Sequence, residues 1–217
     1  MLVGLAACGG GAATTPSVQG PDFIGSGTNG STSNGNTGGA TPTPAAPITS
    51  ASEMRTARSS LIDKFSPITY TNLTTIPTSG SATFNGYLGG KLANTTDQIT
   101  DSVIGKMNMS VTFSGSSVGV SGAISEFRDA QNRIMTGQLD LTNAALDRNG
   151  NTATDATFTL SADGILRDAQ NRALVFGTAL EGDFLGDTYN AVGGDVLGRV
   201  THNGSSQDFD GVFIAER

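Results

Sequence analysis

The sequence predicts an all-β protein: an eight-stranded antiparallel up-and-down barrel, preceded by a disordered linker and one short amphipathic helix. Three observations lead to this fold class. From Ser79 onward, apolar residues alternate with polar ones at a period of two, as in half-buried strands. Turn residues such as Asn149-Gly150 and Asn203-Gly204 separate the alternating runs. Eight such runs follow one another along the chain, and closing them into a barrel removes exposed sheet edges.

These patterns divide the chain into four parts. Residues 1–8 are an apolar N-terminal segment, and residues 9–50 are a linker rich in Gly, Thr and Pro. Residues 51–78 hold the helix and a pre-barrel segment, and residues 79–217 form the barrel domain.

The composition excludes several function classes. The chain has 217 residues, with 12 Lys and Arg against 19 Asp and Glu, which gives a formal net charge of −7. Without a basic stripe to neutralise phosphates, we expect no nucleic-acid partner. A single cysteine, Cys8, and a single histidine, His202, exclude an intrachain disulfide and the usual zinc sites. We expect no cofactor and no metal.

The first eight residues end in a motif. They read Met-Leu-Val-Gly-Leu-Ala-Ala-Cys, like the end of a secretory signal peptide. The segment Leu5-Ala6-Ala7-Cys8 resembles the lipobox of bacterial lipoproteins, in which the signal is cut before a cysteine that receives lipid. The resemblance implies lipidation, palmitate included, at Cys8, with the complete signal peptide beginning upstream of Met1. Gly9 stands where an Asp would imply inner-membrane retention, so an outer-membrane anchor is implied. The alternative is an unmodified cysteine in an ordinary terminus.

The linker is of low complexity. Gly, Pro, Thr, Ser, Ala and Asn supply 36 of its 42 residues, and Asp22 is its one charge. Such a segment buries too little apolar area to offset its ordering entropy, so we expect disorder. Residues 25–30 match G-x-G-x-x-G, but a dinucleotide site needs a strand before the motif and a helix after it. We therefore interpret the match as linker.

A helix follows the linker. Ser50-Ala51-Ser52-Glu53 is a capping-box pattern, and Met54, Ala57, Leu61 and Phe65 then recur at helical spacing up to Pro67. We expect the helix to cap the core; the alternative is a helix that binds a partner.

The alternating runs fall at 80–91, 104–114, 117–127, 133–142, 155–161, 173–184, 191–202 and 207–216. In the second run, for example, Met107, Met109, Val111 and Phe113 alternate with polar residues. The interior of such a barrel is filled by side chains or holds one small ligand. Three Tyr and no Trp make poor aromatic girdles, which disfavours a small integral outer-membrane β-barrel, the alternative.

A six-residue repeat occurs between strands. Arg128-Asp129-Ala130-Gln131-Asn132-Arg133 returns unchanged at residues 167–172. We expect both copies to be hairpin connections in which Asp and Asn side chains bond to the turn backbone. A role of these Arg/Asp loops in recognition is the alternative.

Two segments match a catalytic motif or the beginning of a metal-binding motif but lack the structural context or residues that the motif needs. Residues 115–119 match G-x-S-x-G around Ser117, but an alternating strand follows instead of the required helix, and His202 is the one candidate base. Residues 147–151 begin like a calcium loop, but Thr152 and Phe158 stand where Gly and Glu are needed. We therefore expect hairpin turns at both places and no enzyme.

The C-terminal strands carry a family resemblance. Phe184 and Gly186 are followed by Ala191, Gly193 and Gly194, and later by Gly211, Phe213 and Ala215. This pattern resembles the barrel domain of the transferrin-binding protein B family of bacterial surface lipoproteins. In that family a G-x-F-x-G strand leads to an alanine and a double glycine, and a G-x-F-x-A-like strand closes the barrel. The resemblance implies structural roles for these residues, with Phe184 and Phe213 filling the interior.

The sequence thus predicts an outer-membrane lipoprotein whose barrel is a non-catalytic binding module, on the surface or the periplasmic face. The family resemblance implies a host protein or an iron- or haem-related ligand, and a TonB-type receptor as a further candidate partner. The alternatives are a structural envelope lipoprotein without a specific ligand and an enzyme on a barrel scaffold.

Overall fold

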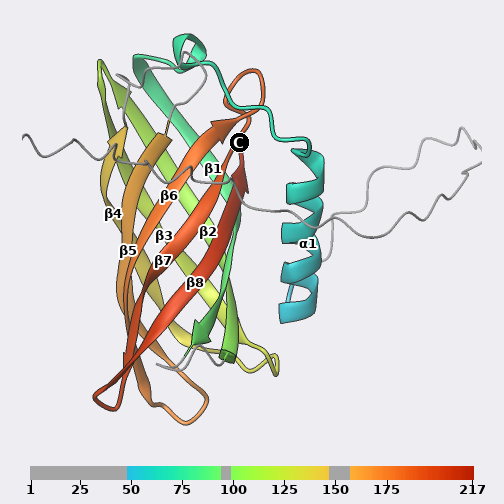
Figure 1. The fold of residues 1–217 in the computed structure, drawn as a ribbon, viewed down its shortest axis with the longest axis vertical. Coiled ribbons are helices and arrows are strands. Elements are labelled where there is room, and N and C mark those ends of the chain that lie inside the picture. Colours follow the sequence, from blue (N-terminus) through green and yellow to red (C-terminus); the bar gives the residue numbers. More distant parts are fainter. Residues whose placement is uncertain (1–47, 94–98, 147–156) are drawn as a thin grey trace, which may run out of the picture.

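A closed β-barrel with one helix on its outer wall makes up the described residues, 48–93, 99–146 and 157–217, of this computed structural model (Figure 1). The strands are β1 (Ser79–Ala93), β2 (Ile99–Ser114), β3 (Ser117–Asp129), β4 (Thr136–Leu146), β5 (Thr157–Arg167), β6 (Ala173–Leu185), β7 (Ala191–His202) and β8 (Ser205–Glu216). Each strand pairs antiparallel with the next, and β8 pairs with β1. The predicted eight-stranded up-and-down barrel is confirmed.

Three predicted strands differ from the observed ones by three residues or more at an end. The second, predicted from residue 104, begins at Ile99, and the fourth, predicted to end at residue 142, continues to Leu146. The fifth strand, predicted to end at residue 161, continues to Arg167, because Ala162 and Leu166 still face the interior. Gly164 between them hides the apolar alternation. The fourth strand, predicted from residue 133, begins at Thr136, because Arg133 belongs to the preceding hairpin turn.

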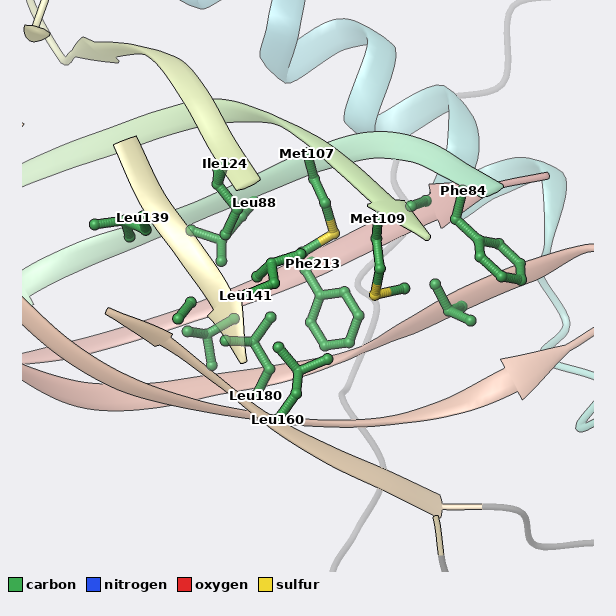
Figure 2. Close-up of a cluster of buried hydrophobic side chains, with 14 of the residues drawn as sticks. Phe84, Leu88, Met107, Met109, Ile124, Leu139, Leu141, Leu160, Leu180 and Phe213 are labelled. Atoms are coloured by element: carbon green, nitrogen blue, oxygen red, sulfur yellow. The ribbon is translucent and has the colours of Figure 1, made fainter. Parts of the chain in front are cut away.

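Apolar side chains fill the barrel interior. Figure 2 shows side chains from different strands pointing toward one another, among them Met107, Leu160 and Phe213. Aromatic rings contact each other at one end of this core: the ring centroid of Phe184 lies 5.3 Å from that of Phe158 and 6.1 Å from that of Phe84. The core is therefore a packed apolar interior.

Some of these rings fit because neighbouring strands carry glycine. A Cβ added at Gly182 on β6 would lie 2.6 Å from Cζ of Phe213, and one at Gly90 on β1 would lie 2.5 Å from Cζ of Phe209. Real side chains do not approach so closely. The phenylalanines of β8 thus pack directly against the backbone of β6 and β1.

The helix α1 (Ala51–Lys64) begins with the predicted capping box: Ser50 Oγ accepts from the Glu53 N–H, and the Glu53 carboxylate accepts from the Ser50 N–H. Its apolar face covers the outer wall of β1, β2 and β8, instead of an end of the core. Met54 packs on Ile104, an outward-facing residue of β2. Lys64 forms an ion pair with Glu216 of β8.

A short 3-10 helix, η1 (Leu73–Thr75), joins α1 to the barrel. No helix among residues 48–93, 99–146 and 157–217 is long and apolar enough to cross a membrane.

The repeated six-residue segments are hairpin connections, as predicted, but only the Asp side chains bond to the turn backbone; the Asn side chains, also predicted to do so, do not in the part of the chain that the structure describes. The carboxylate of Asp129 accepts hydrogen bonds from the N–H groups of Gln131 and Arg133. Asp168 makes the same two bonds in the second copy. Because alternate connections of an up-and-down barrel lie at the same end, both turns lie at one end of the barrel (Figure 1). The first turn lies beside the N-terminus of α1, where Asn132 contacts Ala51.

Candidate functional site

A groove of about 700 Å³ lies between α1 and the outer wall of β1, β2 and β3. The helix α1 forms one side of the groove, the strands form its floor, and the C-terminal end of β8 lies at its rim. It is lined by Ala57, Ser60, Leu61, Asn85, Gly86, Tyr87, Lys106, Met107, Asn108, Ser125, Glu126, Glu216 and Arg217. This groove brings together residues of α1, of the first three strands and of the end of β8.

An amide pair lies on the groove floor. Asn85 and Asn108 are opposite each other in the register of β1 and β2, and both side chains are exposed. Nδ2 of Asn108 donates to Oδ1 of Asn85 over 2.7 Å. The pair still has the NH2 group of Asn85 and the carbonyl of Asn108, a donor and an acceptor, to offer to a ligand.

An ion pair lies next to the amides. Nζ of Lys106 is 2.6 Å from Oε2 of Glu126. Glu126 is held by a β-bulge, because Glu126 and Phe127 together stand opposite Gly105 in the β2–β3 register. Its backbone has φ of 53°, a left-handed conformation that costs free energy in a residue other than glycine. Bulges of this kind often redirect a side chain beside a functional site.

Tyr87 continues the floor beside Lys106. Burial raises the pKa of Tyr87, an effect that the Lys106 charge partly offsets and the Glu126 charge increases, so the phenol stays protonated at neutral pH. At the rim, the Arg217 guanidinium lies 4.6 Å from the centre of the Tyr189 ring. Two cations, Lys106 and Arg217, and two carboxylates, Glu126 and Glu216, line the groove. The net charge of its side chains is therefore close to zero.

A different feature of α1 is a partly buried cation, Arg58. Nε of Arg58 is buried and has no hydrogen-bond partner. The guanidinium presses on β1, since a Cβ at Gly89 would lie 2.2 Å from its Nη1. Burial, with a smaller effect of the Arg55 charge, lowers the pKa of Arg58. Within the described ranges no carboxylate pairs with it, so Arg58 weakens the docking of α1.

The residues that carry the family resemblance lie together in the wall formed by β6, β7 and β8. Phe184 and Phe213 are buried in the interior, and Ala191 is buried where β7 begins. A Cβ at Gly194 would lie 2.1 Å from the carbonyl oxygen of Glu181.

The other glycines of this set are also constrained. Gly186 has φ of 82° in the β6–β7 connection, a backbone conformation that favours glycine. Cβ atoms at Gly193 and Gly211 would lie 2.8 Å from Cδ1 of Ile214 and 2.6 Å from the carbonyl oxygen of Gly89. Packing accounts for all of these positions.

The serine of the G-x-S-x-G motif and its candidate base, His202, lie far apart. Ser117 begins β3, and its hydroxyl donates to the Ser114 carbonyl across the turn, as expected for a hairpin. His202 ends β7, so it lies at the opposite end of the barrel from Ser117. Cys8, the linker with its G-x-G-x-x-G segment, and the loop at Asp147 lie outside the described residues.

Sequence reasoning did not find the groove. Alternation predicts that Lys106 and Asn108 face outward, but their partners come from β1 and β3 and depend on register. No family model, no curated protein and no solved structure matches the chain.

Proposed function

We propose that the protein is a non-catalytic binding module that takes a protein ligand in the groove beside α1 and is held at the outer membrane by lipid on Cys8. The observation that carries the binding proposal is the convergence of the Asn85–Asn108 amide pair, the Lys106–Glu126 ion pair and Tyr87 in one groove. The interior is occupied by apolar side chains, so a ligand is expected to bind outside the barrel.

The chemistry of the groove favours a polypeptide ligand. A main-chain amide offers one donor and one acceptor, and the asparagine pair can bind both, through the NH2 group of Asn85 and the carbonyl of Asn108. The near-neutral lining imposes no requirement for a charged ligand. Tyrosine and arginine, present as Tyr87 and Arg217, are also enriched among residues that dominate protein interfaces.

The charges on the outer wall favour attachment by a lipid anchor and disfavour a barrel that spans the membrane. Carboxylates face outward from five consecutive strands: Asp140, Asp163, Glu181, Asp195 and Asp210. A spanning barrel has the reverse arrangement, with an apolar outer face and a polar lumen. The attachment we propose is therefore through Cys8 and the linker, with the barrel outside the lipid.

A capture experiment tests the groove. The wild-type protein, Asn108→Arg and Thr112→Arg are immobilised, exposed to serum and to spent growth medium, and their captured proteins are quantified by mass spectrometry. Thr112 is exposed on the same strand as Asn108 but outside the groove, so its variant controls for added charge. We expect a captured protein that Thr112→Arg keeps and Asn108→Arg loses.

If all three proteins capture the same set, the groove is not the binding site. If none captures anything, the protein is better described as a structural envelope lipoprotein, the second candidate function.

The anchor is tested separately. Expressed from its own gene in a bacterium with an outer membrane, the protein should partition into detergent and carry a diacylglyceryl mass on Cys8. Cys8→Ser should yield a protein without lipid. An unmodified Cys8, with residues still attached before it, contradicts the anchor and leaves the binding proposal standing.

A further inference from the structure

The two copies of the repeated turn are built alike. In each, the Asp carboxylate accepts from two backbone N–H groups and from the Nε of the second Arg, at 2.5 Å in the first copy and 2.6 Å in the second. In each, the first Arg donates to the carbonyl oxygen of the Asn. Asn132 and Asn171 have φ of 64° and 61°. The turns present the same atoms in the same arrangement.

The copies differ in what the Asn side chain binds. Oδ1 of Asn132 accepts the N–H of Ala51, the first residue of α1, over 2.7 Å. The first N–H groups of a helix have no partner within the helix, so this bond satisfies one of them. Within the described ranges, Oδ1 of Asn171 receives no hydrogen bond. The first turn therefore shows which ligand this arrangement of atoms accepts, namely the N-terminus of a helix.

Apolar side chains surround the second turn. Ile165 and Val175 are opposite each other on β5 and β6, both face outward, and they are 50% and 46% exposed. Ile134, 58% exposed, precedes β4 on the other side of β5. At the first turn, α1 makes its apolar contact with the neighbouring strand: Met54 covers Ile104 of β2, which lies opposite Arg128. The second turn thus has both a capping group and an apolar surface next to it.

We propose that the second turn, with Asn171, Ile134, Ile165 and Val175, is a docking site for the N-terminus of an amphipathic helix from a partner protein. Asn171 accepts one of the free N–H groups of the helix, and the apolar residues of the first two helical turns cover Ile165 and Val175. This surface is separate from the groove beside α1, so the partner is additional to the groove ligand.

The closest available probe is α1 itself as a synthetic peptide of residues 48–66, added to the full protein. Chemical shifts of the Ile and Val methyl groups and of the turn amides report where it binds. We expect saturable shifts at Ile165, Val175 and the second turn. Shifts confined to the first turn, which mean that the peptide only displaces α1, or no shifts at millimolar peptide, overturn the proposal.

Matched variants separate docking from turn stability. Glycine tolerates positive φ, so Asn171→Gly removes the amide group and keeps the turn. It should weaken peptide binding about fivefold, the usual effect of losing one capping bond, without lowering the melting temperature. Ile165→Ser should weaken binding further. Asn132→Gly, the control, should leave peptide binding at the second turn unchanged while it increases hydrogen exchange at the start of α1. Equal affinity for Asn171→Gly, Ile165→Ser and the wild type contradicts the proposal.

Discussion

Truncation of Phe213 tests how the barrel is packed. The side chain is 2% exposed, and its ring meets that of Phe158 edge-on at 6.1 Å. It lies over Gly182, which has no side chain that could move into the space left by Phe213→Ala. The vacated volume therefore remains as a cavity, and the free energy of unfolding should fall by about 3–5 kcal/mol.

The assay is urea and thermal unfolding followed by circular dichroism, since the chain has no tryptophan for fluorescence. For a domain of this size the loss corresponds to a decrease in melting temperature of about 10 °C. Leu197→Ala is the matched control: Leu197 is 60% exposed on β7, and its truncation should change the free energy of unfolding by less than about 0.5 kcal/mol. If Phe213→Ala unfolds at the same urea concentration as Leu197→Ala, the inward register of β8 is wrong.

Three further predictions concern backbone approach, buried charge and pH. Gly194→Val should lower the melting temperature by more than Phe213→Ala does, because its Cβ would meet a backbone carbonyl at 2.1 Å; an unchanged thermal scan would refute this close approach. Arg58→Met should raise the free energy of unfolding by about 1 kcal/mol and slow hydrogen exchange in α1, because it removes a buried charge and keeps the side-chain length; faster exchange would show that the guanidinium has a partner. Burial raises the pKa of Asp195, and the charges of Asp210 and Glu181 raise it further. A raised carboxyl pKa means that the native state holds the proton more tightly, so stability falls as pH rises from the ordinary carboxyl range through the folded pKa. Asp195→Asn should flatten that decrease in urea midpoints measured from pH 3 to 7, and a parallel curve would contradict the shift.

The fold was predictable because its signals are local. Alternation such as that from Met107 to Phe113 needs one strand only, and the capping box and the two Asp-Asn turns need about six residues each. The prediction failed at Gly164, where small residues hide the alternation, and at α1, which covers the wall of the barrel instead of its end.

The groove was not predictable, because contacts between strands, and not local signals, bring its residues together. Asn85 and Asn108 meet only because of the β1–β2 register, and Glu126 reaches Lys106 only because of a bulge. The lipid on Cys8, the outer-membrane location and the relation to transferrin-binding proteins stay predictions, since they depend on residues 1–47 or on family evidence.

The pairing of β8 with β1 has a consequence for biosynthesis. These strands are the most distant in the chain that touch: Asn85 lies opposite Glu216, and Lys64 of α1 reaches across to the same glutamate. Contacts of such long sequence separation form slowly, because a large loop must close first. On the ribosome, the hairpins from β1 to β7 are complete while the edge of β1 still has unpaired N–H and C=O groups that attract other extended chains. The emergence of β8 supplies the strand that covers this edge, so a chain truncated before Ser205 is an aggregation hazard rather than a smaller barrel.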